Sequence, residues 1–152
     1  MSQPRALGRR LLLMMLLGLL PAQAGSSSAA EAAGYKLVVN SQNPASALPR
    51  KQVSAMFLKK VTAWDHGGKV APVDLGADSP VREIFTKDVH GKTVAAVKGY
   101  WQQLIFSGRG VPPPEKSSDA EVIAFVKASP GAVGYVSLQQ ATADVKVVRV
   151  EP

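Results

Sequence analysis

The stretch over residues 70–90 most constrains the fold, because it has the pattern of a strand, a tight turn and a helix in immediate succession. An apolar run leads into a glycine-containing turn, and Ser79 and Pro80 then open an amphipathic segment. Serine before a helix caps its first free amides, and proline fits the first helical position. We expect a strand over residues 70–74 and a helix over residues 79–90. A turn into a helix N-terminus is also a common way to build an anion site, because the helix dipole makes that end positive.

Arg82 is the unusual residue of this helix start. A cation in the first turn works against the helix dipole. Either Asp74 or Asp78 neutralises it, or it faces an anionic ligand. The candidate anion site consists of the Ser79 hydroxyl, the amides of Val81 and Arg82, and the Arg82 guanidinium as counter-charge.

Strands and helices alternate along the rest of the chain, which predicts an α/β domain with at least some parallel pairing. The other expected strands cover residues 35–40, 132–136 and 145–150. The other expected helices cover residues 48–58, a segment capped by Thr93 and a segment capped by Asp119. Phe85 and Trp101 lie on apolar stripes at helical spacing, so we expect both in the core. Residues 106–114 are rich in Gly and Pro, and we expect a rigid surface connector there.

The first 24 residues have the three parts of a secretory signal peptide: a basic start, an apolar run over residues 11–20 and a small-residue site ending at Ala24. We expect cleavage after Ala24 and a soluble exported product; the alternative is an uncleaved N-terminal anchor. Residues 25–34 are small and polar, and we expect them to form a disordered lead. Residues 35–152 have the length of one small domain.

The composition excludes several classes of function. The chain has no cysteine, and therefore no disulfide and no thiol chemistry. Without the three leader arginines it carries 15 basic and 11 acidic side chains, a net charge of +4. These cations are scattered, whereas nucleic-acid binding needs a basic cluster interleaved with aromatic residues. We therefore expect no nucleic-acid partner.

The sequence also offers little for catalysis. His66 and His90 have no carboxylate cluster at metal-ligand spacing around them, and we expect both to be solvated. No G-x-S-x-G or phosphate-binding glycine motif is present. We expect no catalytic residue, no metal and no cofactor.

Four blocks of the chain carry a resemblance to a known family. They are residues 56–64 with Gly68, residues 78–85, residues 100–108 and residues 130–136. Together they resemble the periplasmic phosphate-binding proteins of ABC importers, the last two blocks matching short members with one lobe. The resemblance implies the fold of a single lobe of a type II periplasmic binding protein, with a small mixed or parallel sheet flanked by helices.

The same resemblance implies a function. It is that of an exported, periplasmic solute-binding domain that takes phosphate or a similar oxyanion in ABC-type uptake or sensing. An ABC permease or a sensor protein would be the partner, and self-association is compatible with the role. After leader cleavage the chain would not span a membrane.

The phosphate loop of the two-lobed relatives, Arg-x-Asp-x-Ser-Gly-Thr, is only partly matched. Ser79 matches its serine, but Leu75 and Ala77 stand where the arginine and aspartate are expected. Pro80 and Val81 replace the Gly-Thr pair, which removes one amide donor and one hydroxyl. The alternative function is therefore an envelope protein–protein interaction domain that kept the fold without ligand binding.

Overall fold

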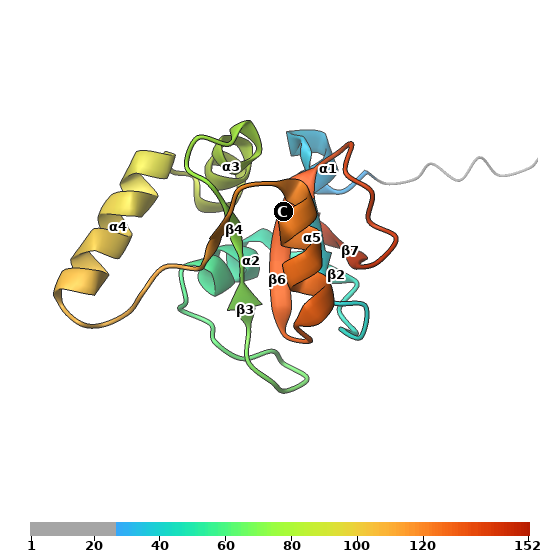
Figure 1. Cartoon of the computed structure of the whole chain (residues 1–152), viewed down its shortest axis with the longest axis horizontal. Coiled ribbons are helices and arrows are strands. Elements are labelled where there is room, and N and C mark those ends of the chain that lie inside the picture. The colour runs from blue at the N-terminus through green and yellow to red at the C-terminus, as the bar shows by residue number, and fades with distance from the viewer. Residues whose placement is uncertain (1–26) are drawn as a thin grey trace, which may run out of the picture.

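The central sheet is built around strand β1 (Tyr35–Val39), whose side chains are nearly all buried. β1 pairs antiparallel with β6 (Ala132–Ser137) on one side and with β7 (Lys146–Glu151) on the other. The outer strands run parallel to their neighbours: β2 (Ala47–Pro49) beside β7, and β3 (Ala71–Pro72) beside β6. The sheet has the order β2-β7-β1-β6-β3 and is mixed, as the sequence predicts (Figure 1).

Helices cover both faces of this sheet. Gly134 of β6 faces α5 (Asp119–Ala128) so closely that a Cβ there would lie 2.8 Å from a valine of that helix. The next residue, Tyr135, packs on aromatic rings of α2 (Arg50–Phe57) and α3 (Pro80–Phe85). Successive side chains of a strand point to opposite faces, so α5 and the α2–α3 pair enclose the sheet between them. In Figure 1, α5 lies in front of β6 and α2 lies behind.

The strand expected over residues 70–74 is in fact two short strands in two sheets. After β3 the amide of Val73 donates to a carbonyl of β6 at 2.9 Å. The amide of Asp74 donates instead to a carbonyl just before β5 (Glu115–Lys116), also at 2.9 Å. β4 (Asp74–Leu75) thereby pairs in parallel with β5 in a separate two-stranded sheet. The chain leaves the central sheet directly before the candidate site.

The predicted helix over residues 79–90 is confirmed, with a change of winding in its second half. α3 continues into the π-helix η1 (Thr86–His90), which ends at Gly91 in the left-handed conformation with φ of 61°. A π-helical turn carries one more residue than an α-helical turn and redirects the side chains that follow. It therefore sets the direction in which His90 points.

Two of the predicted helix caps are confirmed and one is displaced. Ser79 caps α3, and Thr93 caps α4 (Val94–Phe106). Ser118, not Asp119, caps α5. Asp119 instead accepts hydrogen bonds from the backbone and hydroxyl of the last residue of β6, so it links α5 to the sheet.

The computed structural model describes residues 27–152, so the expected signal peptide lies outside the described residues. The disordered lead expected over residues 25–34 is wrong from Ser28 onward. α1 (Ala29–Ala33) is held there by a capping box in which Ser28 and Glu31 each bond the other's backbone amide. Ala30 is buried in the main core. Within the described part, no helix combines the length and apolar character needed to cross a bilayer.

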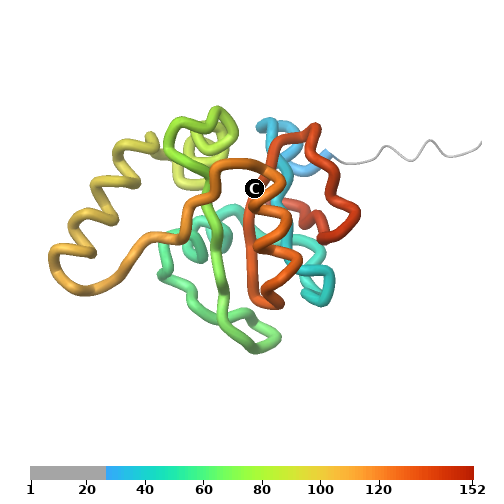
Figure 2. Tube along the Cα trace, in the orientation of Figure 1, coloured from blue at the N-terminus to red at the C-terminus, as the bar shows by residue number. Residues whose placement is uncertain are grey.

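Two unequal cores result. The main core fills the space between the sheet and its helices and includes Phe85, as predicted. α4 lies at one end of the long axis, and the chain returns from its far end through residues 107–114 to β5 (Figure 2). Trp101 is 4% exposed and buried as predicted, but it belongs to a separate small core with Leu58 and Val97.

Candidate functional site

The start of α3 is fixed by its own sequence. The Ser79 hydroxyl oxygen accepts a hydrogen bond from the Arg82 amide at 3.3 Å, and Pro80 occupies the first helical position. The Ser79 amide donates back to Gly76 at 3.0 Å, which closes the preceding turn. Val81 is half-buried against the main core. The Ser79 oxygen is thus engaged with its own helix.

The Arg82 side chain turns inward and is only 3% exposed. Its Nη1 donates to the Leu75 carbonyl at 2.5 Å and to the Glu115 carboxylate at 2.7 Å. Its Nε lies 3.6 Å from the carboxylate of Asp74. The guanidinium therefore joins β4, β5 and α3 through charge-assisted hydrogen bonds, which are the stronger kind.

Asp74 is the buried centre of this network. It accepts a hydrogen bond from the Tyr135 hydroxyl at 2.5 Å, and that hydroxyl accepts one from the Leu75 amide at 3.2 Å. Burial raises the pKa of Asp74, while Arg82 and Tyr135 act to lower it. Burial and the Asp74 charge raise the pKa of Tyr135. Burial acts to lower the pKa of Arg82, but Asp74 and Glu115 act to raise it by more. The net shift is therefore upward, and the guanidinium stays charged.

These contacts decide the question that the sequence left open about Arg82. Asp74, one of the two candidate aspartates, is its internal partner. Glu115 is a second partner that sequence reasoning missed, because no local pattern links positions 33 residues apart. Direct contact of Ser79, Val81 and Arg82 with an anion stays a prediction.

A cavity of about 720 Å³ opens beside this segment. Its walls come from the turn before α3, the outer side of α3, η1 and the first turn of α4. The lining residues are Ala77, Glu83, Lys87, Gly91, Lys92, Thr93 and Val94. The lining includes two lysines and one carboxylate, so the cavity is net positive. The sequence signal for this cavity is the lysine directly before the Thr93 cap.

His90 is not solvated, contrary to expectation. Its Nδ1 lies 2.8 Å from the Ser54 hydroxyl, and its ring packs edge-on against Phe85. Burial, together with the nearby cations Arg82, Lys92 and Lys60, lowers the pKa of His90 to about 4. A neutral, half-buried histidine thus joins α2 to the end of η1.

Known catalytic and metal arrangements need more than this pair. A nucleophilic serine needs a histidine that a third group orients, and the hydrogen bonds of the described residues give His90 only Ser54. Among residues 27–152, no group of three or more His, Asp or Glu side chains is placed to hold a metal ion.

Comparison with protein families identifies the class. Residues 33–150 match the model of the PBP superfamily domain. The chain belongs to this superfamily, and its architecture is that of one lobe of a periplasmic binding protein. A comparison with curated proteins finds no match.

Solved structures support the same class. An ABC-type phosphate transport receptor from Vibrio cholerae is similar, with a TM-score of 0.59 and 23% identity over 77% of this chain and 46% of that one. A phosphate ABC transporter substrate-binding protein from Clostridium perfringens with bound phosphate has a TM-score of 0.61 and 21% identity, over 77% of this chain and 44% of that one. A phosphate-binding protein from Stenotrophomonas maltophilia has a TM-score of 0.55 and 19% identity, over 78% of this chain and 39% of that one.

The chain thus spans less than half the length of these structures. At these identities the likeness establishes the fold. The predicted family and the predicted single-lobe fold are both confirmed.

Proposed function

We propose that the chain is an exported, periplasmic domain that binds phosphate or a similar oxyanion in ABC-type uptake or sensing, with a permease or sensor protein as its partner. Its membership of the PBP superfamily supports this role. So do the phosphate-binding titles of the similar structures. The leader pattern of the first 24 residues supports the compartment.

The observation that carries the proposal is the net positive cavity beside the segment that resembles the phosphate loop. Lys87 and Lys92 would supply the charge for an oxyanion held there. Ser79 and Val81 would present the start of α3. Arg82, already bound to Asp74 and Glu115, would hold the turn in shape in addition to any direct contact with the ligand.

Binding by the isolated chain should be weak, roughly micromolar to millimolar. The cavity is open to water, and a charge pair at contact distance in water is worth only about 1 kcal/mol. Glu83 in the cavity wall opposes an anion further. A second body, either a partner protein or another copy, would exclude water and strengthen binding.

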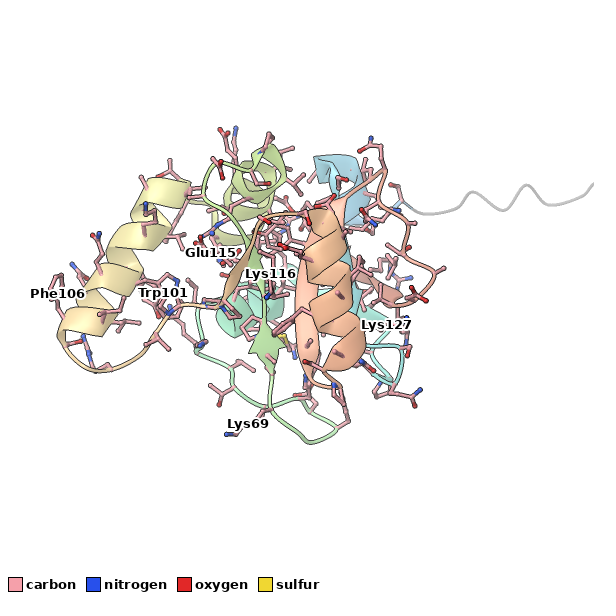
Figure 3. The ribbon with its side chains drawn as sticks, viewed as in Figure 1. Lys69, Trp101, Phe106, Glu115, Lys116 and Lys127 are labelled. Carbon is pink, nitrogen blue, oxygen red and sulfur yellow. The ribbon has the colours of Figure 1, made fainter. Side chains whose placement is uncertain are left out.

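Titration calorimetry of the purified protein with inorganic phosphate and with sulfate tests the proposal. We expect Lys87→Gln combined with Lys92→Gln to weaken binding at least fivefold, and Ser79→Ala to weaken it less. The matched control is Lys69→Gln with Lys127→Gln. These lysines lie away from α3 (Figure 3) and should leave binding unchanged.

Two results would count against this proposal. The absence of heat with both anions at millimolar concentration would leave the alternative, an envelope interaction domain that kept the fold without the ligand. The internal use of Arg82 is the observation that favours this alternative. Binding that depends equally on the control lysines would show that the anion has no defined site.

A further inference from the structure

The end of α4 and the loop after it carry an unusual concentration of exposed apolar side chains. Phe106 is 90% exposed, Val111 63% and Ile105 50%. They are the three most exposed large apolar side chains among the described residues. We name residues 105–111 the apolar tip. Single exposed apolar residues are ordinary, but a cluster of them marks a surface that contacts something other than water.

The backbone holds the apolar tip in one shape. Gly108 closes α4 in the left-handed conformation with φ of 67°, and its amide donates to the Ile105 carbonyl at 3.0 Å. The Arg109 amide donates to Leu104 at 2.9 Å, and a Cβ on Gly110 would lie 3.9 Å from the Trp101 ring. This is a helix end closed by a glycine and anchored on a buried tryptophan. The exposed apolar side chains therefore lie on an ordered helix end and not on a loose loop.

The charge around the apolar tip has one sign. Residues 91–114 contain Lys92, Lys98 and Arg109 and no acidic residue. Lys98 is seven residues before Ile105, and two helical turns place both on the same side of α4. The Arg109 Nε donates to the hydroxyl of Ser107, the C-cap of α4, at 3.0 Å, so its charge lies at the negative end of the helix dipole. Apolar and cationic groups thus share this end of the molecule.

The position of the apolar tip limits what can cover it. α4 occupies one end of the long axis, with Phe106 directed away from the body and Trp101 directed toward it (Figure 3). An exposed apolar helix end with cations beside it needs no shaped cavity when it enters the headgroup region of an anionic bilayer. A second copy placed tip to tip would bring the same cations together, which costs energy.

We propose that the apolar tip is a docking site for an anionic membrane surface. Phe106, with Ile105 and Val111, enters the boundary between headgroups and acyl chains, about 5–10 Å deep for elements of this kind. Lys98 and Arg109 pair with lipid phosphates. The protein then lies on the membrane with its main core in water. This inference is independent of the oxyanion cavity.

Co-sedimentation with phosphatidylcholine vesicles, with and without phosphatidylglycerol, tests this. We expect binding to the phosphatidylglycerol vesicles that is at least tenfold tighter than binding to pure phosphatidylcholine. It should be lost at about 1 M salt, where charge interactions reach only about 3 Å. Phe106→Ser should weaken it at least tenfold, and Arg109→Glu should weaken it similarly. Leu138→Ser, an exposed apolar residue outside the apolar tip, is the matched control.

The possible results distinguish a membrane surface from a second copy of the chain as the partner of the apolar tip. Absence of binding to phosphatidylglycerol vesicles at low salt would overturn the proposal, as would binding that Phe106→Ser leaves unchanged. Sedimentation velocity covers the second-copy alternative: a dimer that Phe106→Ser dissociates would assign the apolar tip to self-association and also overturn it. Circular dichroism of each variant shows whether it is folded. If Phe106→Ser does not fold, Arg109→Glu, which changes an exposed side chain, tests the proposal independently.

Discussion

The main core and the small core under α4 bury aromatic rings in different settings. In the main core, Phe85 stacks on Tyr135 with ring centroids 3.8 Å apart, and Tyr35 and Phe57 close around the pair. Under α4, Trp101 has only two other buried partners. The body of the domain is therefore stabilised by one shared aromatic cluster, whereas α4 depends on a few local contacts.

This difference predicts two levels of stability within one fold. Regions with few buried contacts open locally, at a lower free energy than global unfolding. α4 is tied to the body by its small core and by the Tyr100 hydroxyl, which donates to the Leu58 carbonyl at 3.0 Å. We expect α4 to open while the sheet stays folded. Four experiments test this contrast.

Phe85→Ala should have the largest effect. Removing a fully buried ring from the aromatic cluster should lower the free energy of unfolding by about 3–5 kcal/mol. Urea denaturation followed by circular dichroism measures this value. The neighbouring Ile84→Ala, at a position that is 37% exposed, is the control and should cost much less. Equal losses in the two variants would show that Phe85 is not a central support of the core.

The next largest effect should be the pH dependence of the free energy of unfolding that His90 causes. His90 lies where the two regions meet. The pKa of the folded state is about 4 and the ordinary value is 6.5. As the pH falls below 6.5, the unfolded chain takes up a proton that the folded chain does not, so stability falls until about pH 4. Between pH 7.5 and 5 the loss should be about 2 kcal/mol. His90→Gln should remove this slope, while His66→Gln at an exposed position should retain it; a slope that persists in His90→Gln would contradict the assignment.

The example of His90 shows which structural features a sequence reveals. Ser79 and Thr93 were predicted as caps because capping depends on a few adjacent residues. The contact of His90 with Ser54 spans 36 residues and follows the π-helical turn, for which the sequence has no local signal. The alternation of helices and strands predicted the α/β class, and β1 still proved antiparallel to both of its neighbours.

Trp101 and Arg82 show the same limit at the candidate site. Helical spacing predicts correctly that Trp101 is buried, but not in which core, since periodicity describes one helix and not its neighbour. Arg82 was recognised as unusual, and Asp74 was among its expected partners. The role of Glu115 depends on the pairing of β4 with β5, two strands of two residues each, too short to leave a pattern.

Trp101→Ala should cost less than Phe85→Ala, although both remove a buried ring. The loss cannot exceed the free energy of local opening of α4. We expect that free energy to fall by roughly 2 kcal/mol, rather than by the about 3–5 kcal/mol of a shared core. Hydrogen exchange of the α4 amides should speed up strongly, while the amides of β1 and β6 keep their protection. A global loss as large as that of Phe85→Ala would show that α4 and the sheet unfold as one unit.

The smallest effect gives the sharpest comparison, because the same chemistry occurs once in each region. Thr93 caps α4 by accepting from Ala96 at 3.1 Å, and Ser118 caps α5 by accepting from Glu121 at 3.2 Å. Loss of such a cap costs about 1 kcal/mol. Since α5 packs on the sheet, Ser118→Ala should lower the global free energy of unfolding by that amount. Thr93→Ala should leave the urea midpoint nearly unchanged and raise the exchange rate of the α4 amides about fivefold, the equivalent of 1 kcal/mol in a local opening equilibrium. Equal shifts of the urea midpoint in the two variants would mean that the small core is coupled to the main core, and that the apolar tip is held as firmly as the sheet.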